Sequence, residues 1–441
     1  MQFFCNAVII LFFAGLSTST LVAQTTRKEQ ITKVYDIFPS GSLVLSSVRS
    51  DIEILTWDSN EVKVMGELTY EDDGNKEDIG KLLNAFRNMN AESSKDVLKL
   101  NLNLIQSSST NSKLFRKAET TTILYDGNKI SMDASKIKTT YTIWIPASLS
   151  VKVDSKYGKL KMASIRGDVN CVLFSNDLVM GDFGESGIFD IKYSSATIGS
   201  GGELKLNVFN GKVNIAEVKN LFVDSKYSKC NITKANDVLL QSFNDTFVFE
   251  MVNDIDVSAK YSTIRIENNA GQSKFDFFNS KLFGKNFQTM FISSKYSEFN
   301  AADLGETRIN LAFNSKFNFA TVNTLICRES KYDTFKLGEI VVNTSFQEAF
   351  NTKIDIDRTS VSLKGFSGNF KYGTVNLKLN PAVEYNLKYD GQYGQLDVAS
   401  DKFKTRFISE KNGSKTTIQG SNADAKCNIE LVTFNTTCKI Y

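Results

Sequence analysis

A lysine recurs at one repeat position along most of this chain and could bind negatively charged groups. Each of these lysines directly precedes a tyrosine, and the alternation of side chains along a strand predicts that they all project outward in one row. If consecutive coils of a repeat structure lie about 4.8 Å apart, the lysines recur roughly every 10 Å. The row consists of Lys156, Lys192, Lys226, Lys260, Lys295, Lys331 and Lys371.

The lysine row has two interpretations. It could bind an anionic polymer, such as an acidic polysaccharide or teichoic acid, through many weak contacts. Alternatively, the lysines keep a long sheet face in solution and prevent lateral pairing of strands. Asp154 and Asp224, two residues before their lysines, would neutralise part of the row. The tyrosines that follow the lysines could stack on sugars only if their rings are exposed.

The sequence offers little for catalysis. It contains no histidine, which removes the usual general base, the Ser-His-Asp arrangement and His-ligated zinc. It also lacks a glycine-rich phosphate loop and a Cys-x-x-Cys pair. Acidic pairs at a helix start favour the helix dipole, and alternating carboxylates on a strand point to solvent. We therefore expect no catalytic residue, cofactor or metal at the carboxylate pairs Asp72-Asp73, Glu77-Asp78 and Asp254/Asp256.

The cysteines and the net charge limit the possible partners and cross-links. After the N-terminal segment, Cys171, Cys230, Cys327, Cys427 and Cys438 remain, an odd number that does not indicate a disulfide framework. Cys427 and Cys438 could pair with each other, whereas Cys230 lies at an apolar position. The formal charge of +3 gives no indication of a nucleic-acid partner.

The N-terminus is typical of an export signal. Residues 6–16 form an apolar run too short to span a bilayer comfortably, and small residues follow up to Ala23. We therefore expect a signal peptide over residues 1–24 and an exported protein that is periplasmic, surface-located or secreted. The alternative is a buried N-terminal strand. No later stretch is apolar enough to span a membrane.

Two aromatic series define the repeat. The tyrosines lie 34 to 36 residues apart, and a phenylalanine, usually followed by asparagine, lies between each pair. The underlying step is therefore 16 to 19 residues, although a coil of about 35 residues is the alternative. We expect both series to be structural, in aligned or interleaved columns. The series are Tyr157, Tyr193, Tyr227, Tyr261, Tyr296, Tyr332 and Phe174, Phe209, Phe243, Phe278, Phe313, Phe350.

Apolar residues alternate with polar ones on both sides of each aromatic residue, which is typical of strands. After a tyrosine they fall at +3 and +5, as at Cys230 and Ile232, and after a phenylalanine at +4 and +6. This change of parity indicates a corner. Strand, corner and strand at a fixed step predict an all-β fold: a single-stranded parallel β-solenoid, a right-handed β-helix. Since the tyrosines share the parity of Val223 and Val257, we expect them to be mostly buried.

The layout along the chain follows from where the repeat holds. Residues 25–150 should form the N-terminal coils, with a helix near 75–90 and a mobile loop near 106–122. The helix would cover the end of the solenoid with Ile79, Leu82, Phe86 and Met89, and Asp72, Asp73 or Asn75 could cap it. Regular repeats should occupy 151–400, and capping strands 401–441.

Several motifs carry a resemblance to a known family. They are the export signal, Asp51-Ile52-Glu53-Ile54 with Trp57-Asp58, Ile143-Trp144-Ile145-Pro146, and the segment from Leu149 to Leu160. With them the chain resembles the bacterial putative-adhesin families of unknown function, exported β-solenoids similar in style to the auto-transporter adhesin head domain. The resemblance implies the fold and brings no catalytic residues. Tyr-Ser or Phe-Asn stands where many relatives would have Asn-Gly at the corner, which leaves the ligand open.

These observations favour one function and leave a second one open. The first is a non-enzymatic adhesin or envelope scaffold that binds a glycan, such as an anionic polysaccharide, or an envelope protein through a repetitive surface. The second is a carbohydrate-active β-helix enzyme, a polysaccharide lyase or hydrolase. Such an enzyme would need a local break in the repeat where acidic and basic residues converge, but the middle of this chain repeats evenly.

Overall fold

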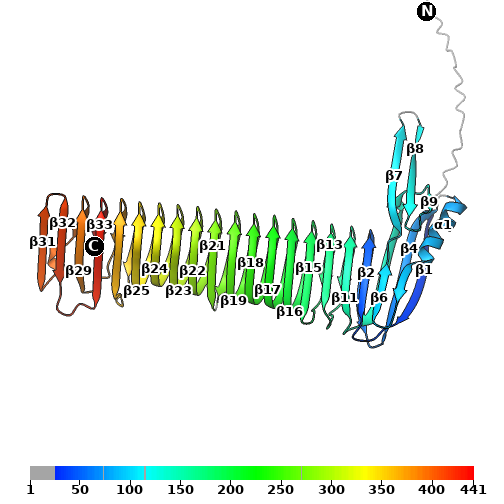
Figure 1. Ribbon diagram of the computed structural model, residues 1–441, viewed down its shortest axis with the longest axis horizontal. Coiled ribbons are helices and arrows are strands. Elements are labelled where there is room, and N and C mark those ends of the chain that lie inside the picture. The colour runs from blue at the N-terminus through cyan, green and yellow to red at the C-terminus, as the bar shows by residue number, and fades with distance from the viewer. Residues whose placement is uncertain (1–24, 73, 114–115, 270) are drawn as a thin grey trace, which may run out of the picture.

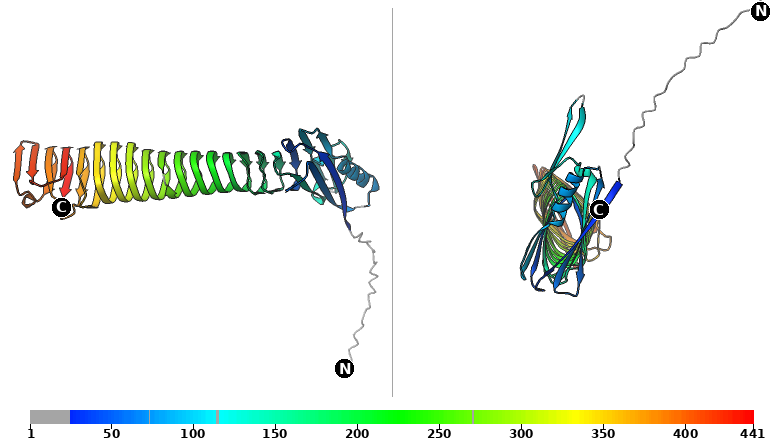
Figure 2. Two further views of the ribbon diagram at one scale, coloured as in Figure 1. Left: turned by 90° about the horizontal axis from the view of Figure 1, so that it is seen from below. Right: turned by 90° about the vertical axis from the view of Figure 1, so that its right-hand side faces the viewer.

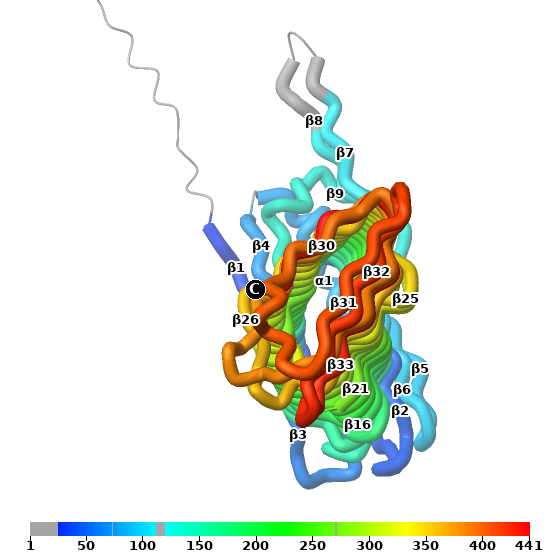
Figure 3. The backbone as a smooth tube through the Cα atoms, turned by 90° about the vertical axis from the view of Figure 1, so that its left-hand side faces the viewer, coloured from blue at the N-terminus to red at the C-terminus, as the bar shows by residue number. Residues whose placement is uncertain are grey.

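The computed structural model describes residues 25–72, 74–113, 116–269 and 271–441. The expected signal peptide and Asp73 therefore lie outside the described residues. The described chain forms one long β-solenoid of about 13 turns with a helix at one end (Figure 1). The coils are flattened, so that two sheet faces enclose a narrow core (Figure 3).

Each coil pairs in parallel with the next. Lys212 is opposite Lys229, and Lys229 is opposite Thr246, so one coil takes 17 residues in this part of the chain. Longer coils accommodate the same pairing, as where Val151 is opposite Val169. The predicted step of 16 to 19 residues is therefore confirmed, and the alternative coil of about 35 residues is wrong because it spans two coils.

The regular body runs from β11 to β28, and its strands alternate inward apolar with outward polar side chains. Inward Phe299, Phe317 and Phe335 stack with ring centroids 5.3 and 4.6 Å apart. Such stacking adds about 0.5–1.5 kcal/mol per pair to the burial of the rings. The strands are β11 (Ser150–Lys156), β12 (Lys159–Met162), β13 (Val169–Phe174), β14 (Asp177–Met180), β15 (Ser186–Lys192), β16 (Ser195–Phe209), β17 (Lys212–Lys226), β18 (Lys229–Phe243), β19 (Thr246–Lys260), β20 (Thr263–Asn269), β21 (Gln272–Phe278), β22 (Lys281–Lys295), β23 (Glu298–Phe313), β24 (Lys316–Lys331), β25 (Thr334–Phe350), β26 (Lys353–Thr359), β27 (Gly365–Lys371) and β28 (Thr374–Leu377).

One corner of every coil turns through a residue in the left-handed region. Tyr227 has φ of 58° and Asn210 has φ of 50°. A left-handed residue breaks the strand alternation, so Lys226 and Tyr227 both point outward and Ser228 points inward. The prediction that the tyrosines are mostly buried was therefore wrong: the six are 47% to 52% exposed. The parity argument failed because it continued the strand through a residue that does not have strand conformation.

The N-terminal end closes the solenoid with antiparallel strands and the helix. The first coil is β2 and β3; β10 pairs with β3 in parallel and with β4 antiparallel, and β1 covers β4. Of the coils expected over residues 25–150, β2 and β3 form one, and β6 and β10 continue its parallel pairing, whereas β1 and β4 are antiparallel. The elements are β1 (Thr25–Asp36), β2 (Ser42–Val48), β3 (Ser50–Trp57), β4 (Glu61–Asp72), α1 (Lys76–Arg87), β5 (Asn90–Ser93), β6 (Val97–Asn101), β7 (Ile105–Lys113), β8 (Arg116–Leu124), β9 (Lys129–Ile130) and β10 (Ile137–Pro146).

The predicted helix lies across this end of the body (Figure 2). Leu82 and Phe86 are buried, and the side chain of Asn75 accepts a hydrogen bond from the N–H of Asp78 as the N-cap. The mobile loop was expected near 106–122, but β7 and β8 pair antiparallel there as a projecting hairpin, so the prediction of a loop was wrong. Rows of Ser and Thr lack the apolar alternation of a buried strand, but they still pair in a hairpin exposed to water.

The C-terminal strands do not follow one another in space. The last two strands of the chain are β33 (Cys427–Phe434) and β34 (Thr437–Ile440). In space they lie between the pair β27 and β28 and the pair β29 (Tyr385–Gln392) and β30 (Gln395–Val398), although both of these pairs come earlier in the sequence. An antiparallel hairpin of β31 (Arg406–Asn412) and β32 (Lys415–Ser421) then covers β29. Cys427 and Cys438 are free buried thiols, so the pairing considered for them is not formed.

Candidate functional site

The lysine row and the phenylalanine series occupy the same position in alternate coils. Lys226 is opposite Phe209 on one side and Phe243 on the other. The next position alternates in the same way, with tyrosine after each lysine and asparagine or serine after each phenylalanine. We call this surface the aromatic corner. In spatial order its pairs are Lys156-Tyr157, Phe174-Ser175, Lys192-Tyr193, Phe209-Asn210, Lys226-Tyr227, Phe243-Asn244, Lys260-Tyr261, Phe278-Asn279, Lys295-Tyr296, Phe313-Asn314, Lys331-Tyr332, Phe350-Asn351, Lys371-Tyr372, Phe434-Asn435 and Gln392-Tyr393.

The tyrosines and phenylalanines of the aromatic corner form a single interleaved column. Tyr227 packs edge-to-face against Phe209 and Phe243, with ring centroids 5.8 and 5.6 Å apart. Tyr261 packs in the same way against Phe243 and Phe278 at 5.6 Å. Each tyrosine adopts the left-handed conformation at a cost of about 1 kcal/mol or more, which contacts with two neighbouring rings can offset. The rings are therefore held rigidly although they are half-exposed.

The lysines of the row are exposed, and only some are neutralised. Lys192 is paired with Asp190 at 2.9 Å and Lys331 with Glu329 at 2.6 Å. The hydrogen bond to Glu329 raises the pKa of Lys331. Lys156 lies 3.9 Å from Asp154, at the limit of an ion pair. Of the predicted neutralising residues, Asp154 is therefore in place, whereas Asp224 makes no ion pair with Lys226.

A central stretch of the row carries free charge. Within the described parts of the chain, Lys226, Lys260 and Lys295 make no ion pair, and two residues before Lys260 and Lys295 stand Ser258 and Ser293. Lys371, in the described residues near the end of the row, is likewise without one. Three of these unpaired lysines are thus on successive Lys-Tyr coils in the middle of the row, with Asp276 on an intervening coil opposite Ser258 and Ser293.

A second set of lysines flanks the aromatic corner on its other side. They stand two residues after the left-handed residue and are exposed at the start of the next strand. Sequence reasoning missed them because they do not follow the Lys-Tyr motif; the signal was a lysine two residues after Tyr or Asn. Lys281 and Lys353 have acidic partners at 4.0 and 3.2 Å. The set is Lys159, Lys212, Lys229, Lys281, Lys316 and Lys353.

Beneath the aromatic corner, small polar side chains connect the coils. The N–H of Ser262 donates to Ser280 Oγ at 3.1 Å, and the N–H of Ser280 donates to Ser297 Oγ at 3.2 Å. The side chain of one coil thus accepts from the backbone of its neighbour, where the turn interrupts the ladder. This column satisfies buried donors and fixes the position of the exposed residues above it.

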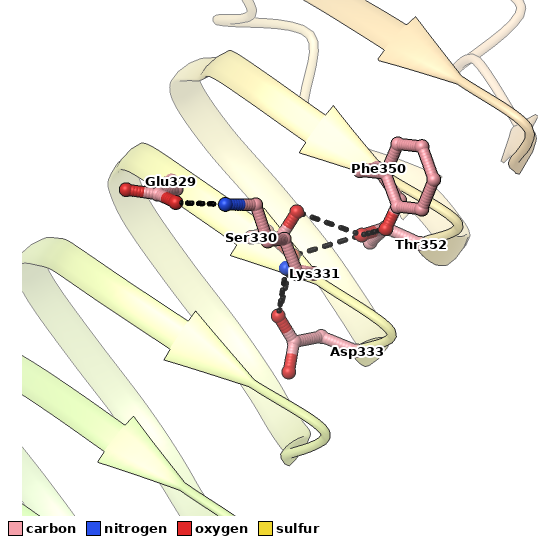
Figure 4. Close-up of polar contacts among 6 residues, drawn as sticks. All are labelled: Glu329, Ser330, Lys331, Asp333, Phe350 and Thr352. Carbon is pink, nitrogen blue, oxygen red and sulfur yellow. Dashed lines mark hydrogen bonds and ion pairs between the residues drawn. The ribbon is translucent and has the colours of Figure 1, made fainter.

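Asp333 replaces serine in this column and is almost fully buried. Figure 4 shows it beside Lys331, with which it shares a hydrogen bond. Its carboxylate accepts from the N–H of Ser315 at 2.6 Å, from Ser330 Oγ at 2.7 Å and from the N–H of Lys331 at 2.9 Å. Burial raises the pKa of Asp333 to about 6, and the hydrogen bonds oppose this rise. Burial likewise raises the pKa of Asp245 at the equivalent position.

The carboxylates considered for catalysis have structural contacts. Asp78 is buried and accepts from the N–H of Ser131 at 2.8 Å. Asp256 pairs with Lys274 at 2.8 Å, and Asp254 accepts from the N–H of Gln272. Asp72 pairs with Arg27 at 2.5 Å. The described residues contain no group of three or more Cys, Asp or Glu side chains that could hold a metal ion.

The hollows of the molecule are open and lie mainly on the sheet faces. Two that adjoin at Asp256, Lys274 and Phe291 have volumes of about 620 and 720 Å³. A third, of about 580 Å³, lies on the opposite face around Phe283. At the aromatic corner itself there is a small hollow of about 220 Å³ between Lys331 and Lys371. No enclosed cleft of the kind that holds a small substrate is found among these described hollows.

Comparison with known proteins finds no family for this chain and only weak structural similarity. No family model matches the chain, and no curated protein matches it. Among solved structures, a "putative cell adhesion protein" from Clostridium sporogenes is similar over 94% of this chain and 99% of that one, at 8% identity and a TM-score of 0.15. A "putative lipid binding protein" from Parabacteroides distasonis is similar over 93% and 96%, at 8% identity and a TM-score of 0.16.

None of the helices among the described residues is long and apolar enough to cross a bilayer. The β-solenoid fold that the resemblance of the sequence motifs implied is the fold observed. What it binds is inferred below from its own residues.

Proposed function

We propose that this protein is a non-enzymatic adhesin or envelope scaffold, exported from the cell, that binds an anionic polysaccharide along the aromatic corner. The observation that carries the proposal is the middle of that corner. There, exposed lysines without acidic partners stand beside half-exposed, rigidly held tyrosine rings in several successive repeats. An envelope protein is the second partner considered from the sequence.

Physical chemistry favours a polymer over a small ligand. A single exposed lysine contributes little to binding, about 0–1 kcal/mol, because water and salt screen it. Identical sites along a rigid rod act together, however, when one chain contacts several of them at once. Sugar rings also pack well against aromatic side chains, because both present flat apolar faces. A long acidic glycan uses all of these contacts.

The competing function is a polysaccharide lyase or hydrolase. It would need acids and bases that converge in a cleft. The described carboxylates considered above instead bind backbone N–H groups, as Asp78 and Asp254 do, or pair with lysine, as Asp256 does. This supports a binding role for the protein.

The test is a screen of acidic and neutral polysaccharides for binding and for new reducing or unsaturated ends. We expect binding to acidic polymers that weakens as salt rises, with no turnover. The triple variant K226Q/K260Q/K295Q should reduce binding by about tenfold or more while the melting temperature stays unchanged. Turnover of any polymer would show the non-enzymatic assignment to be wrong.

A matched control removes the same charge elsewhere. Lys152, Lys219 and Lys336 are exposed outside the aromatic corner, so K152Q/K219Q/K336Q should bind as the unchanged protein does. Equal losses in both triple variants would mean that net charge, and not the aromatic corner, attracts the polymer. If the lysines only keep the sheet in solution, the corner variant should lose solubility and no binding should change.

A further inference from the structure

The alternation within the aromatic corner sets a period for its ligand. Lys-Tyr coils alternate with Phe-Asn coils, and neighbouring coils are about 4.8 Å apart, so each Lys-Tyr pair recurs after roughly 10 Å. We propose that the ligand is a linear acidic polysaccharide in which charged and neutral sugars alternate, with one carboxylate per disaccharide. This inference rests on the proposed function and names the class of polymer that it would bind.

The tyrosines make the period rigid. A lysine side chain alone could reach over several ångströms, so a row of lysines would accept many charge spacings. Each tyrosine ring, in contrast, is fixed between two phenylalanine rings, as Tyr261 is between Phe243 and Phe278 at 5.6 Å. Its hydroxyl and the adjacent ammonium group provide two donors for one carboxylate. These donor pairs recur at a fixed interval that the fold determines.

The intervening coils are suited to an uncharged sugar. At the position of the lysine they carry a half-buried phenylalanine, such as Phe243 or Phe278, followed by an asparagine. The ring edge accepts an apolar sugar face, and the asparagine side chain can exchange hydrogen bonds with hydroxyl groups. A second anion placed there would lie against an aromatic ring. At the position that lysine and phenylalanine share, the surface along the rod is therefore cationic, apolar, cationic, apolar, although Lys212, Lys281 and Lys316 of the flanking set lie on Phe-Asn coils.

The free lysines locate the best part of this surface. Lys226, Lys260 and Lys295 lie on three successive Lys-Tyr coils and make no ion pair within the chain as described. Lys229 and Lys281, of the flanking set, border the same stretch. Three donor pairs correspond to three disaccharides, so we expect a hexasaccharide to be the shortest tight ligand. Polyphosphate and teichoic acid carry their charges at spacings that do not match.

The test exchanges two residues that occupy the same position in neighbouring coils. F243K/K260F keeps composition and charge but changes the intervals between lysines along the corner. The probe is a series of oligosaccharides that alternate glucuronate with N-acetylglucosamine, compared with polygalacturonate and polyphosphate by titration calorimetry. We expect the exchange to weaken hexasaccharide binding by about tenfold and to leave polyphosphate binding unchanged. N318K/K336N, the same kind of exchange on a sheet face, is the control.

The outcomes separate this inference from the proposed function. If the unchanged protein binds polyanions and loses binding in K226Q/K260Q/K295Q, but F243K/K260F binds normally, the period is irrelevant and only the inference fails. Stronger binding of polyphosphate or polygalacturonate than of the alternating polymer would also overturn the inference. If no polyanion binds at all, both fail. Melting curves of the exchanged variant show whether a loss of binding reflects unfolding.

Discussion

The ring of Phe434 packs edge-to-face against that of Tyr372, with centroids 5.3 Å apart, although β28 to β32 separate the two residues in the sequence. On its other side Phe434 contacts Tyr393 at 5.6 Å. The inserted pair Phe434-Asn435 therefore supplies the Phe-Asn coil that the alternation requires between two tyrosine coils. The final strands occupy an internal coil position, and not the end of the rod.

This insertion predicts a specific effect of truncating Phe434. F434A removes two ring contacts and should destabilise the C-terminal coils by about 1–3 kcal/mol. Because each coil contacts only its neighbours, the loss should appear as faster amide hydrogen exchange in β29 and β30. V432A, at an exposed position of the same strand, should change stability by less than about 0.5 kcal/mol. Equal exchange rates in F434A and the unchanged protein would contradict the role of the insertion.

The buried Asp333 predicts a pH dependence of stability. Its pKa of about 6 in the fold lies above the ordinary value of 3.8, so the folded state binds the proton more tightly. The contribution of protonated Asp333 to the free energy of unfolding is therefore complete below about pH 4. It is lost as the pH rises through about 6, which lowers the free energy of unfolding by roughly 2–3 kcal/mol. D333S should reduce this dependence to the part due to Asp245, whose pKa burial also raises, and serine fits because it occupies the same position at Ser297 and Ser315. Denaturant unfolding between pH 4 and 8 measures it.

The reciprocal change at Ser297 is the control for this prediction. S297D places a carboxylate at the equivalent buried position and should introduce a loss of stability over the same pH range. If D333S and the unchanged protein lose stability in parallel as pH rises, another group is responsible and the assignment to Asp333 is wrong.

The left-handed tyrosines predict different effects of alanine and asparagine. Y261A loses two ring contacts and keeps the unfavourable backbone conformation, so it should cost about 2 kcal/mol. Y261N loses the same contacts but introduces a residue that tolerates φ of 57°, as Asn244 and Asn279 do in the neighbouring coils. It should be about 1 kcal/mol more stable than Y261A. Thermal unfolding of the two variants compares them directly, and equal stability would show that the backbone conformation is without cost.

The helix predicts a protective role at the N-terminal end. Leu82 and Phe86 are buried against that end of the solenoid, and the ring of Phe86 lies 6.4 Å from that of Tyr141. L82D/F86D should release α1, expose the end of the core and cause association or a loss of more than about 4 kcal/mol. N84D, on the exposed side of the same helix, is the control. Light scattering after size exclusion, together with melting curves, tests whether α1 protects this end of the core. A monomeric double variant with an unchanged melting temperature would contradict the protective role.

The sequence by itself determined the architecture, because the signal for it is local and repeated. Alternation around Cys230 and Ile232 indicates strands, the regular return of Lys226-Tyr227 and its equivalents sets the coil, and the 3.6-residue pattern of Leu82 and Phe86 indicates the helix. Each of these patterns depends only on which side chains avoid water within a few residues. Repetition then makes the pattern unmistakable over the whole body.

Only the tertiary structure decided which way the tyrosines point and which strands are neighbours. Whether the side chain of Tyr227 faces the core or the solvent depends on a single left-handed φ angle. Bulky residues rarely adopt this conformation, and here the ring contacts with Phe209 and Phe243 stabilise it. The position of β33 depends on pairing between segments far apart in the chain. The backbone hydrogen bonds that form this pairing do not depend on side-chain type, so the sequence does not indicate which strands pair. Both features rest on contacts between coils, and no pattern within one coil contains them.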